Sequence, residues 1–121
     1  MESKWKLYDA EYRMADIVWR NEPLHSRTLA ELCQSELGWK RSTTYTVLKK
    51  LCDRGILQNQ NATVTALVSR AEAQRYEAYA LMEKSFAGSL PQFIAAFLGD
   101  KKLSGEEAAE LKRLIDAHRG G

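Results

Sequence analysis

The chain has few of the residues that build metal sites, disulfides or membrane spans. Its only cysteines are Cys33 and Cys52, and its only histidines are His25 and His118. The cysteines lack Cys-x-x-Cys spacing and neither histidine is near them, so we expect buried free thiols and no metal site. No apolar run approaches the roughly 18 residues that cross a membrane, and residues 1–6 lack an apolar signal-peptide core. These features predict a cytoplasmic protein.

Residue groups that carry catalysis or hold cofactors are also missing. The sequence contains no glycine-rich phosphate loop and no serine, histidine and aspartate set with a plausible acidic partner. It also shows no pair of carboxylates expected to be buried, because Glu11 and Asp16 on the first predicted helix are expected to be surface charges. The sequence therefore predicts no enzyme activity and no cofactor.

Net charge is nearly balanced, but its distribution is uneven. The chain carries a net charge of +2, and residues 1–70 hold 11 Lys and Arg against 8 Asp and Glu, whereas residues 71–121 hold 7 against 8. Most of the excess lies in residues 40–54, where Asp53 is the only acidic residue. A local basic patch on a near-neutral protein is an adequate phosphate-binding surface.

Residues 38–57 carry the most informative pattern. From Arg41 onward, apolar or small side chains repeat at the i, i+3, i+4, i+7 spacing of a buried helical face. This face consists of Thr44, Val47, Leu48 and Leu51. The opposite face carries hydroxyls, an aromatic ring and lysines, which can meet base edges and phosphates in the major groove of DNA. The alternative is an ordinary amphipathic surface helix with a solvated cationic face. The flanking segments decide between a DNA-contacting helix and this alternative.

Those segments predict a helix-turn-helix. A first helix from about Leu7 stops before Pro23, because proline biases the preceding residue away from the helical region. A second helix is expected over residues 26–37, capped by His25 or Ser26, of which serine is the better acceptor. The short break that follows contains Gly38, as in helix-turn-helix units, whose second helix lies in the major groove.

A β-hairpin is expected after the third helix. Gly55 is a typical helix-ending residue, and residues 56–60 and 64–69 can pair as two strands around a turn of residues 61–63. This hairpin would be the wing of a winged helix domain over residues 1–70. The predicted wing has no Lys or Arg, which puts its contribution to phosphate contact in doubt.

Residues 71–121 predict a helical region that joins two chains. Capping boxes at Ser69 to Glu72 and Ser104 to Glu107 start two helices, and Leu90-Pro91 suits the first turn of another. Short isolated helices are marginal in water, so self-association would supply the missing apolar surface. The predicted dimerisation residues are Tyr76, Tyr79, Met82, Phe86, Phe93, Ile94, Phe97, Leu111, Leu114 and Ile115. The alternative is that these helices fold back onto the winged domain as one monomeric core.

Three segments carry a resemblance to a known family: LYDAEYRMADIVWRNEPL, TLAELCQSELGWKRSTTYTVLKKLCDRGIL and SFAGSLPQFIAAFLGDKKLSGEEAAELKRLI. In order and almost without gaps, they resemble the penicillinase-repressor family (BlaI/MecI type) over about residues 7–117. The most specific matches are Ala10-Glu11 followed by Trp19, the pair Trp39 and Thr43, and the Ser-Gly-Glu-Glu segment that opens the last helix. The copper-responsive relatives carry a Cys-x-Cys motif near the C-terminus, which this chain lacks.

The resemblance implies a mostly α fold with a β-hairpin wing, and a homodimeric repressor of transcription bound to palindromic operator DNA. The residues expected to contact bases and nearby phosphates are Arg41, Ser42, Thr43, Tyr45 and Thr46, and those expected to contact the backbone are Lys40, Lys49, Lys50 and Arg54. Serine and tyrosine stand at positions 42 and 45, where relatives often carry longer cations, so a different operator is expected. The alternative is a winged helix protein-interaction module that has lost DNA binding.

The resemblance also implies a route of induction. Relatives that control β-lactam-resistance genes are inactivated when a membrane sensor detects a β-lactam and a sensor-activated protease cuts the fifth helix. The matching bond here is Ala96–Phe97. Alanine replaces the asparagine at the cut bond of relatives. The alternative is that Phe93, Ile94 and Phe97 form only interface core and that another signal relieves repression.

Overall fold

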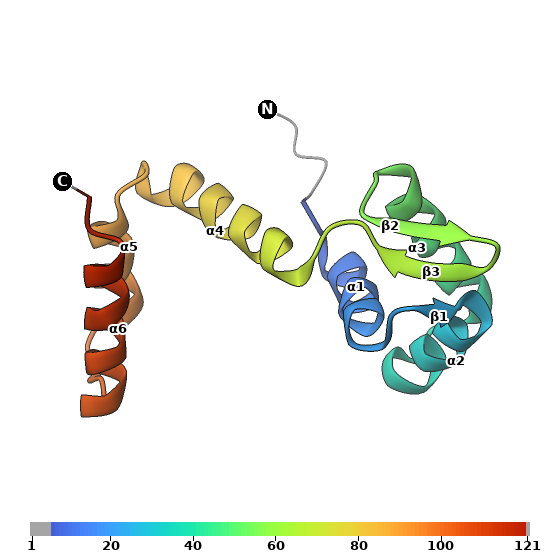
Figure 1. Cartoon of the computed structure of the whole chain (residues 1–121), viewed down its shortest axis with the longest axis horizontal. Coiled ribbons are helices and arrows are strands. Elements are labelled where there is room, and N and C mark those ends of the chain that lie inside the picture. The colour runs from blue at the N-terminus through green and yellow to red at the C-terminus, as the bar shows by residue number, and fades with distance from the viewer. Residues whose placement is uncertain (1–5, 121) are drawn as a thin grey trace. The chain divides into compact units, whose positions relative to one another are not determined.

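The computed structural model describes residues 6–120, in which six helices and three strands follow one another along the chain (Figure 1). The elements are α1 (Asp9–Asn21), β1 (Leu24–His25), α2 (Ser26–Leu37), α3 (Arg41–Asp53), β2 (Leu57–Gln60), β3 (Thr63–Ala66), α4 (Arg70–Phe86), α5 (Leu90–Leu98) and α6 (Gly105–Ala117). This order confirms the predicted fold class, a mostly helical chain with a winged helix and a helical C-terminal region. Two compact units are present: one extends through Leu81 and the other begins at Met82.

The small sheet has the order β1-β3-β2, and both pairings are antiparallel. The predicted hairpin is present, but its turn has two residues, Asn61 and Ala62, because Gln60 already pairs with Thr63. Both turn residues have positive φ, 54° and 65°, as the turns that best match strand twist require. The third strand, β1, was not predicted: only Leu24 and His25 form it, and two residues leave no periodic signal.

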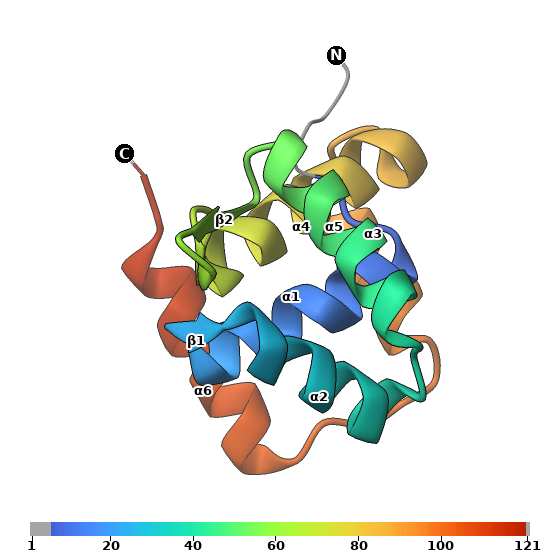
Figure 2. The same ribbon diagram turned by 90° about the vertical axis from the view of Figure 1, so that its right-hand side faces the viewer.

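The core of the first unit lies among α1, α2, α3 and the sheet, and Figure 2 shows these three helices inclined to one another. Its largest fully buried side chains include Met14 and Ile17 from α1, Leu29 from α2, Leu51 from α3 and Ile56 before β2. The apolar spacing of residues 44–51 predicted the buried position of Leu51. Burial of such a continuous apolar set is the main favourable term that holds the three helices in place.

The ends of the first two helices refine the predictions. The first helix begins at Asp9, slightly after the expected start near Leu7, and this leaves Tyr8 61% exposed and Ala10 exposed. Of the two caps predicted for α2, His25 is the one that is used: its Nδ1 accepts a hydrogen bond from the Arg27 N–H at 2.9 Å, while Ser26 is already helical. Pairing of His25 in β1 holds its backbone extended, which suits a cap position. The prediction that Glu11 lies on the surface was wrong, because this residue is only 7% exposed.

The helical boundaries in the second half agree with the capping motifs. Ser69 accepts the Glu72 N–H at 3.1 Å and Glu72 accepts the Ser69 N–H at 2.9 Å, so this capping box is complete. Ser89 caps α5 and Ser104 caps α6, each through its hydroxyl oxygen. Helix α4 ends before Ala87 and Gly88, both with positive φ.

Candidate nucleic-acid interface

The turn between α2 and α3 has the geometry of a helix-turn-helix. Gly38 ends α2 at φ 72°, a left-handed conformation that an alanine would adopt only with strain, and its N–H donates to Gln34 O at 3.0 Å. Trp39 is partly buried against the core, and its N–H donates to Cys33 O at 3.3 Å. Lys40 then precedes α3. The three-residue turn therefore places α3 as the second helix of the unit, as predicted.

Helix α3 is held by one face and exposes the other. Thr44, Leu48 and Leu51 are at most 3% exposed, and Val47 packs partly buried against the same core. Eight of the nine predicted DNA-contacting residues are exposed: Lys40, Arg41, Ser42, Thr43, Tyr45, Thr46, Lys49 and Lys50. Because the buried side fixes the rotation of the helix, these exposed side chains form one polar and cationic surface.

The beginning of α3 is electropositive. Lys40 is its N-cap and supplies no side-chain acceptor, and no acidic residue lies in the first turn, which instead carries Arg41. The exposed backbone N–H groups of a helix start and the helix dipole favour an anion there. Further along, Lys49 forms an exposed ion pair with Asp53 at 3.0 Å, an interaction that solvent weakens.

Arg54, the ninth predicted residue, is placed differently from the others. Its Nη1 donates to Glu11 Oε1 at 2.8 Å and its Nη2 donates to the carbonyl of Lys6. Glu11 Oε1 also accepts the Tyr8 N–H at 3.0 Å. Arg54 thus ties the C-terminal end of α3 to the beginning of α1. Its predicted role at the DNA backbone stays a prediction, but its side chain is only 26% exposed.

The wing presents amides rather than cations. Gln58, Asn59 and Gln60 on β2 are all exposed, and the Ala62 carbonyl at the tip accepts the Ser26 N–H at 2.8 Å. This bond and the pairing of β1 with β3 hold the hairpin against the start of α2. Asparagine and glutamine side chains can read minor-groove base edges without contributing charge.

The predicted dimerisation residues lie on α4, α5 and α6, and the isolated chain leaves much of their surface uncovered. Tyr79 is 66% exposed, Phe97 59% and Ile115 62%. Neither α5 nor α6 has a buried residue. Within the second unit, Phe93 contacts Phe86 edge-on at 5.4 Å and stacks on Phe97 at 6.0 Å between ring centroids. These aromatic contacts leave the outer apolar side of α5 available.

Sequence reasoning missed a set of polar contacts around α1. Trp19, Arg20, Asp16, Glu36 and Arg70 are joined by hydrogen bonds, ion pairs or ring contacts. These partners lie far apart in the sequence, apart from the Asp16 and Arg20 pair, whose i, i+4 spacing was a detectable signal. No local pattern indicates the others.

The two thiols belong to the folded core rather than to a reactive site. Cys33 is fully buried on α2 and Cys52 is partly buried on α3, and neither forms a disulfide. Burial raises the pKa of both thiols above the ordinary value of 9.0. A raised pKa keeps them protonated at neutral pH, where the thiol form is a poor nucleophile.

Comparison with known proteins agrees with this geometry. The chain matches the penicillinase repressor family over residues 7–117. It belongs to that family. The match includes the helix-turn-helix, the wing and all the predicted dimerisation residues. No helix within residues 6–120 has the length and apolarity needed to span a membrane.

Two relatives are similar over almost the full length. The chain is 20% identical to the penicillinase repressor of Bacillus licheniformis over 118 aligned residues. This alignment covers 94% of this chain and 92% of that protein. It is 27% identical over 120 aligned residues to an uncharacterised 16.5 kDa protein in the ptsI 3′ region of Latilactobacillus sakei. That alignment covers 96% of this chain and 82% of the relative. Membership of the penicillinase repressor family gives this chain the role of a DNA-binding repressor of transcription with a winged helix.

Proposed function

We propose that the chain is a sequence-specific repressor that binds a palindromic operator as a homodimer, with α3 of each protomer in the major groove of one half-site. The observation that carries this proposal is the two-sided character of α3. Its inner face is buried down to 0% exposure at Thr44 and Leu51, while Tyr45 is 38% exposed beside exposed hydroxyls and cations. A rigidly seated helix with such an outer face suits base readout.

Each part of the α3 surface has a separate role in this proposal. Arg41, Ser42, Thr43, Tyr45 and Thr46 contact bases and neighbouring phosphates, whereas Lys40, Lys49 and Lys50 contact the backbone. Phosphate contacts position the protein and base contacts select the sequence. The electropositive start of α3 supports phosphate contact there. Operator binding would place the protein in the cytoplasm.

Dimerisation is proposed through α4, α5 and α6 of residues 71–121. The support is the exposed apolar surface on these helices, including Leu90 at 57% and Leu114 at 53%, in addition to the residues described above. Several large apolar side chains left exposed on neighbouring helices in the sequence are typical of a protein interface. Two linked half-site contacts then bind far more tightly than either contact alone.

The DNA-binding proposal is tested by gel shift of the full chain on the promoter of its own operon and on random DNA, at two salt concentrations. Tyr45→Ala should weaken operator binding by about 1–3 kcal/mol while binding to random DNA barely changes. Lys50→Ala should weaken both complexes alike and reduce the salt dependence. An equal loss on both DNAs for Tyr45→Ala would remove the base-reading role. Absence of any shift would favour the protein-interaction module.

The dimer is tested by sedimentation of the full chain at micromolar concentration. The wild-type chain should sediment at twice the mass of one chain, and Leu114→Asp should shift the equilibrium toward monomer, because it places a charge in the apolar interface. Arg113→Asp is the matched control, since Arg113 is exposed on the same helix and outside the apolar set. A wild-type monomer that still binds a single half-site tightly would refute the dimer.

Relief of repression by proteolysis at Ala96–Phe97 is the remaining part of the proposal. Both residues are exposed and α5 contains no buried residue, so α5 has little of its own chain to hold it folded. Segments with few buried contacts open locally at low cost and become accessible to proteases. A sensor-activated protease is therefore a proposed partner, and cutting would separate α6 from the rest of the chain.

A further inference from the structure

The first turn of α4 contacts α1 through polar side chains that are not part of the predicted DNA-contacting surface. Arg70, the first residue of α4, forms an ion pair with Asp16 Oδ1 at 2.7 Å, and its guanidinium lies over the Trp19 ring at 5.0 Å. The Trp19 Nε1–H donates to the Val68 carbonyl at 2.9 Å. We refer to Asp16, Trp19 and Arg70 as the α1–α4 clamp.

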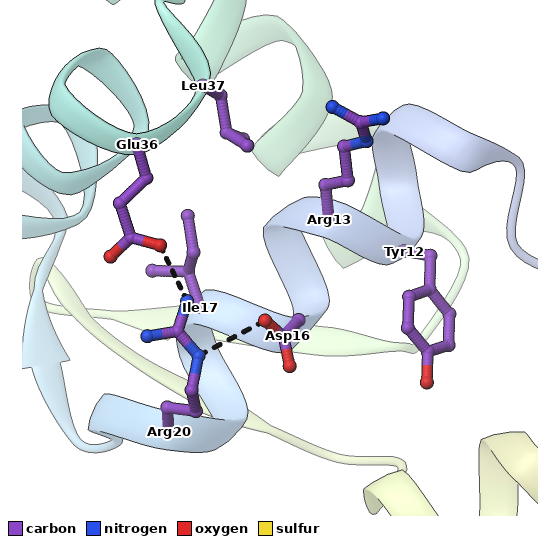
Figure 3. Close-up of a pocket in the computed structure, with 7 residues that line it drawn as sticks. All are labelled: Tyr12, Arg13, Asp16, Ile17, Arg20, Glu36 and Leu37. Atoms are coloured by element: carbon purple, nitrogen blue, oxygen red, sulfur yellow. Dashed lines mark hydrogen bonds and ion pairs between the residues drawn. The ribbon is translucent and has the colours of Figure 1, made fainter.

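The clamp is itself held by neighbouring elements. Trp19 contacts Tyr12 edge-on at 5.5 Å, which fixes the indole from its other side. Asp16 also pairs with Arg20 Nε at 3.1 Å, and Arg20 Nη2 reaches Glu36 Oε1 on α2 at 2.7 Å. Figure 3 shows Arg20 between these two carboxylates. The three residues are part of the lining of a small open pocket of about 140 Å³. The volume is below the roughly 300 Å³ of typical ligand sites, so these charges are better explained as a structural network.

The electrostatics of Asp16 support its part in the clamp. Partial burial by itself would raise the pKa of Asp16, but hydrogen bonds from Arg70 and Arg20 outweigh it and lower the pKa below the ordinary value of 3.8. The carboxylate is therefore charged at neutral pH. Its side chain is 33% exposed, and such half-exposed ion pairs contribute little to folding stability. The clamp is thus better suited to fixing a direction than to holding the fold together.

Two polar contacts at the start of α4 constrain the direction of this helix. Val68 and Ala73, which are 3% and 1% exposed, attach the start of α4 to the core, and the Ser69 to Glu72 capping box fixes where the helix begins. Apolar contacts are non-directional, so by themselves they constrain the angle of α4 less than hydrogen bonds and ion pairs of fixed geometry. The Trp19 bond to Val68 and the Arg70 ion pair act on both sides of Ser69 and oppose a change in that angle.

A small change in the angle of α4 at its start would displace its far end by a large distance, because the helix is long. It has 17 residues and so is about 25 Å long at 1.5 Å per residue. A tilt of about 20° at its start displaces its far end by roughly 9 Å, which exceeds two base-pair steps of about 3.4 Å. Since α4 leads to the helices proposed to join two protomers, its direction decides how far apart the two α3 helices lie.

We propose that Asp16, Trp19 and Arg70 are positioning residues that fix the direction of α4 relative to α3 and thereby set which half-site spacing the dimer accepts. This inference rests on the proposed function. It assigns no DNA contact to the three residues. It predicts that loss of the clamp changes spacing selectivity and leaves the affinity for one half-site unchanged.

The test uses the full chain and duplexes that wild-type protein enriches from random-sequence DNA. From the enriched site, a series is made with the half-sites moved apart in one-base-pair steps, together with a duplex that keeps one half-site. Wild-type affinity should fall about tenfold or more when the spacing changes by roughly half a helical turn. For Arg70→Ala, affinities across the series should lie within about threefold of each other, with half-site affinity unchanged.

The matched control is Arg75→Ala, which removes the same charge from an exposed site on the same helix and should keep the wild-type spacing profile. Trp19→Phe keeps a smaller aromatic ring and removes the N–H donor to Val68, so it provides a second variant if Arg70→Ala unfolds. A wild-type spacing profile in both clamp variants, or an equal loss on every duplex including the half-site, would overturn the inference. If wild-type protein enriches no duplex, the proposed function fails first and the inference falls with it.

Discussion

The Arg54→Ala substitution separates two roles that the sequence alone assigned to one residue. Arg54 was predicted to contact the DNA backbone, yet its guanidinium contacts Glu11 and the Lys6 carbonyl. We expect the substitution to destabilise the winged unit and to leave the salt dependence of DNA binding nearly unchanged. The reason is that Arg54 joins the end of α3 to the start of α1 instead of facing solvent.

The magnitude follows from what remains after the arginine is removed. The Glu11 side chain is 9% exposed and keeps the Tyr8 N–H as a partner at 3.0 Å. Removing one partner of a buried ion pair costs about 3–5 kcal/mol, because the remaining charge stays uncompensated. Arg54 is 26% exposed, so solvent already screens the pair and we expect a smaller loss of about 2–3 kcal/mol. For a unit of this size, such a loss lowers Tm by roughly 10 to 20 °C.

The assay combines thermal unfolding, followed by circular dichroism, with operator binding measured below Tm at several salt concentrations. Lys50→Ala is the matched control, because Lys50 carries the same charge near the same end of α3 and is exposed. That variant should keep the wild-type Tm and reduce the slope of log affinity against log salt by about one. Arg54→Ala should show the reverse, with a lower Tm and an unchanged slope.

The opposite pattern would refute this reasoning. If Arg54→Ala unfolds within about 2 °C of Lys50→Ala, the Glu11 contact is not a structural tie of the expected strength. If the salt slope also falls by about one, Arg54 contacts phosphate as the sequence predicted. A loss of stability together with a reduced slope would show that both roles coexist.

Three further predictions concern the wing, the α1 charges and α5. Ala62→Gly should raise the free energy of unfolding by about 0.5–1 kcal/mol in urea titrations, because alanine is strained at φ 65° and glycine is not; a less stable variant would contradict this reason. Because the pKa of Asp16 is lowered by folding, the stability it contributes is present above its ordinary pKa of 3.8 and lost as pH falls below it. The difference in unfolding free energy between wild type and Asp16→Asn should therefore shrink below that pH, and a difference independent of pH would exclude the ion pairs as its cause. Mass spectrometry of the repressor from its host under β-lactam should reveal a fragment ending at Ala96, whereas an intact chain under full derepression would rule out induction by cutting.

The sequence by itself determined the elements whose signals are local. The spacing of Thr44, Leu48 and Leu51 located the buried face of α3 and therefore its exposed face. Ser69 and Ser104 marked helix starts, because a capping hydroxyl acts on backbone N–H groups only two or three residues away. The family followed from the order of these motifs along nearly the whole chain.

Only the tertiary structure decided which charges are structural. Glu11 and Arg54 are 43 residues apart, and Trp19 and Val68 are 49 residues apart, so no helical or strand periodicity connects either pair. Strand β1 exists only because β3 supplies its hydrogen-bond partners, since two residues cannot form a strand alone. The burial of a carboxylate depends on whether folding brings a cation to it, because an unpaired charge would be expelled to water. That distinction separates Arg54 from the exposed cations of α3, and it lies in the packing of α1 against α3 rather than in the local sequence.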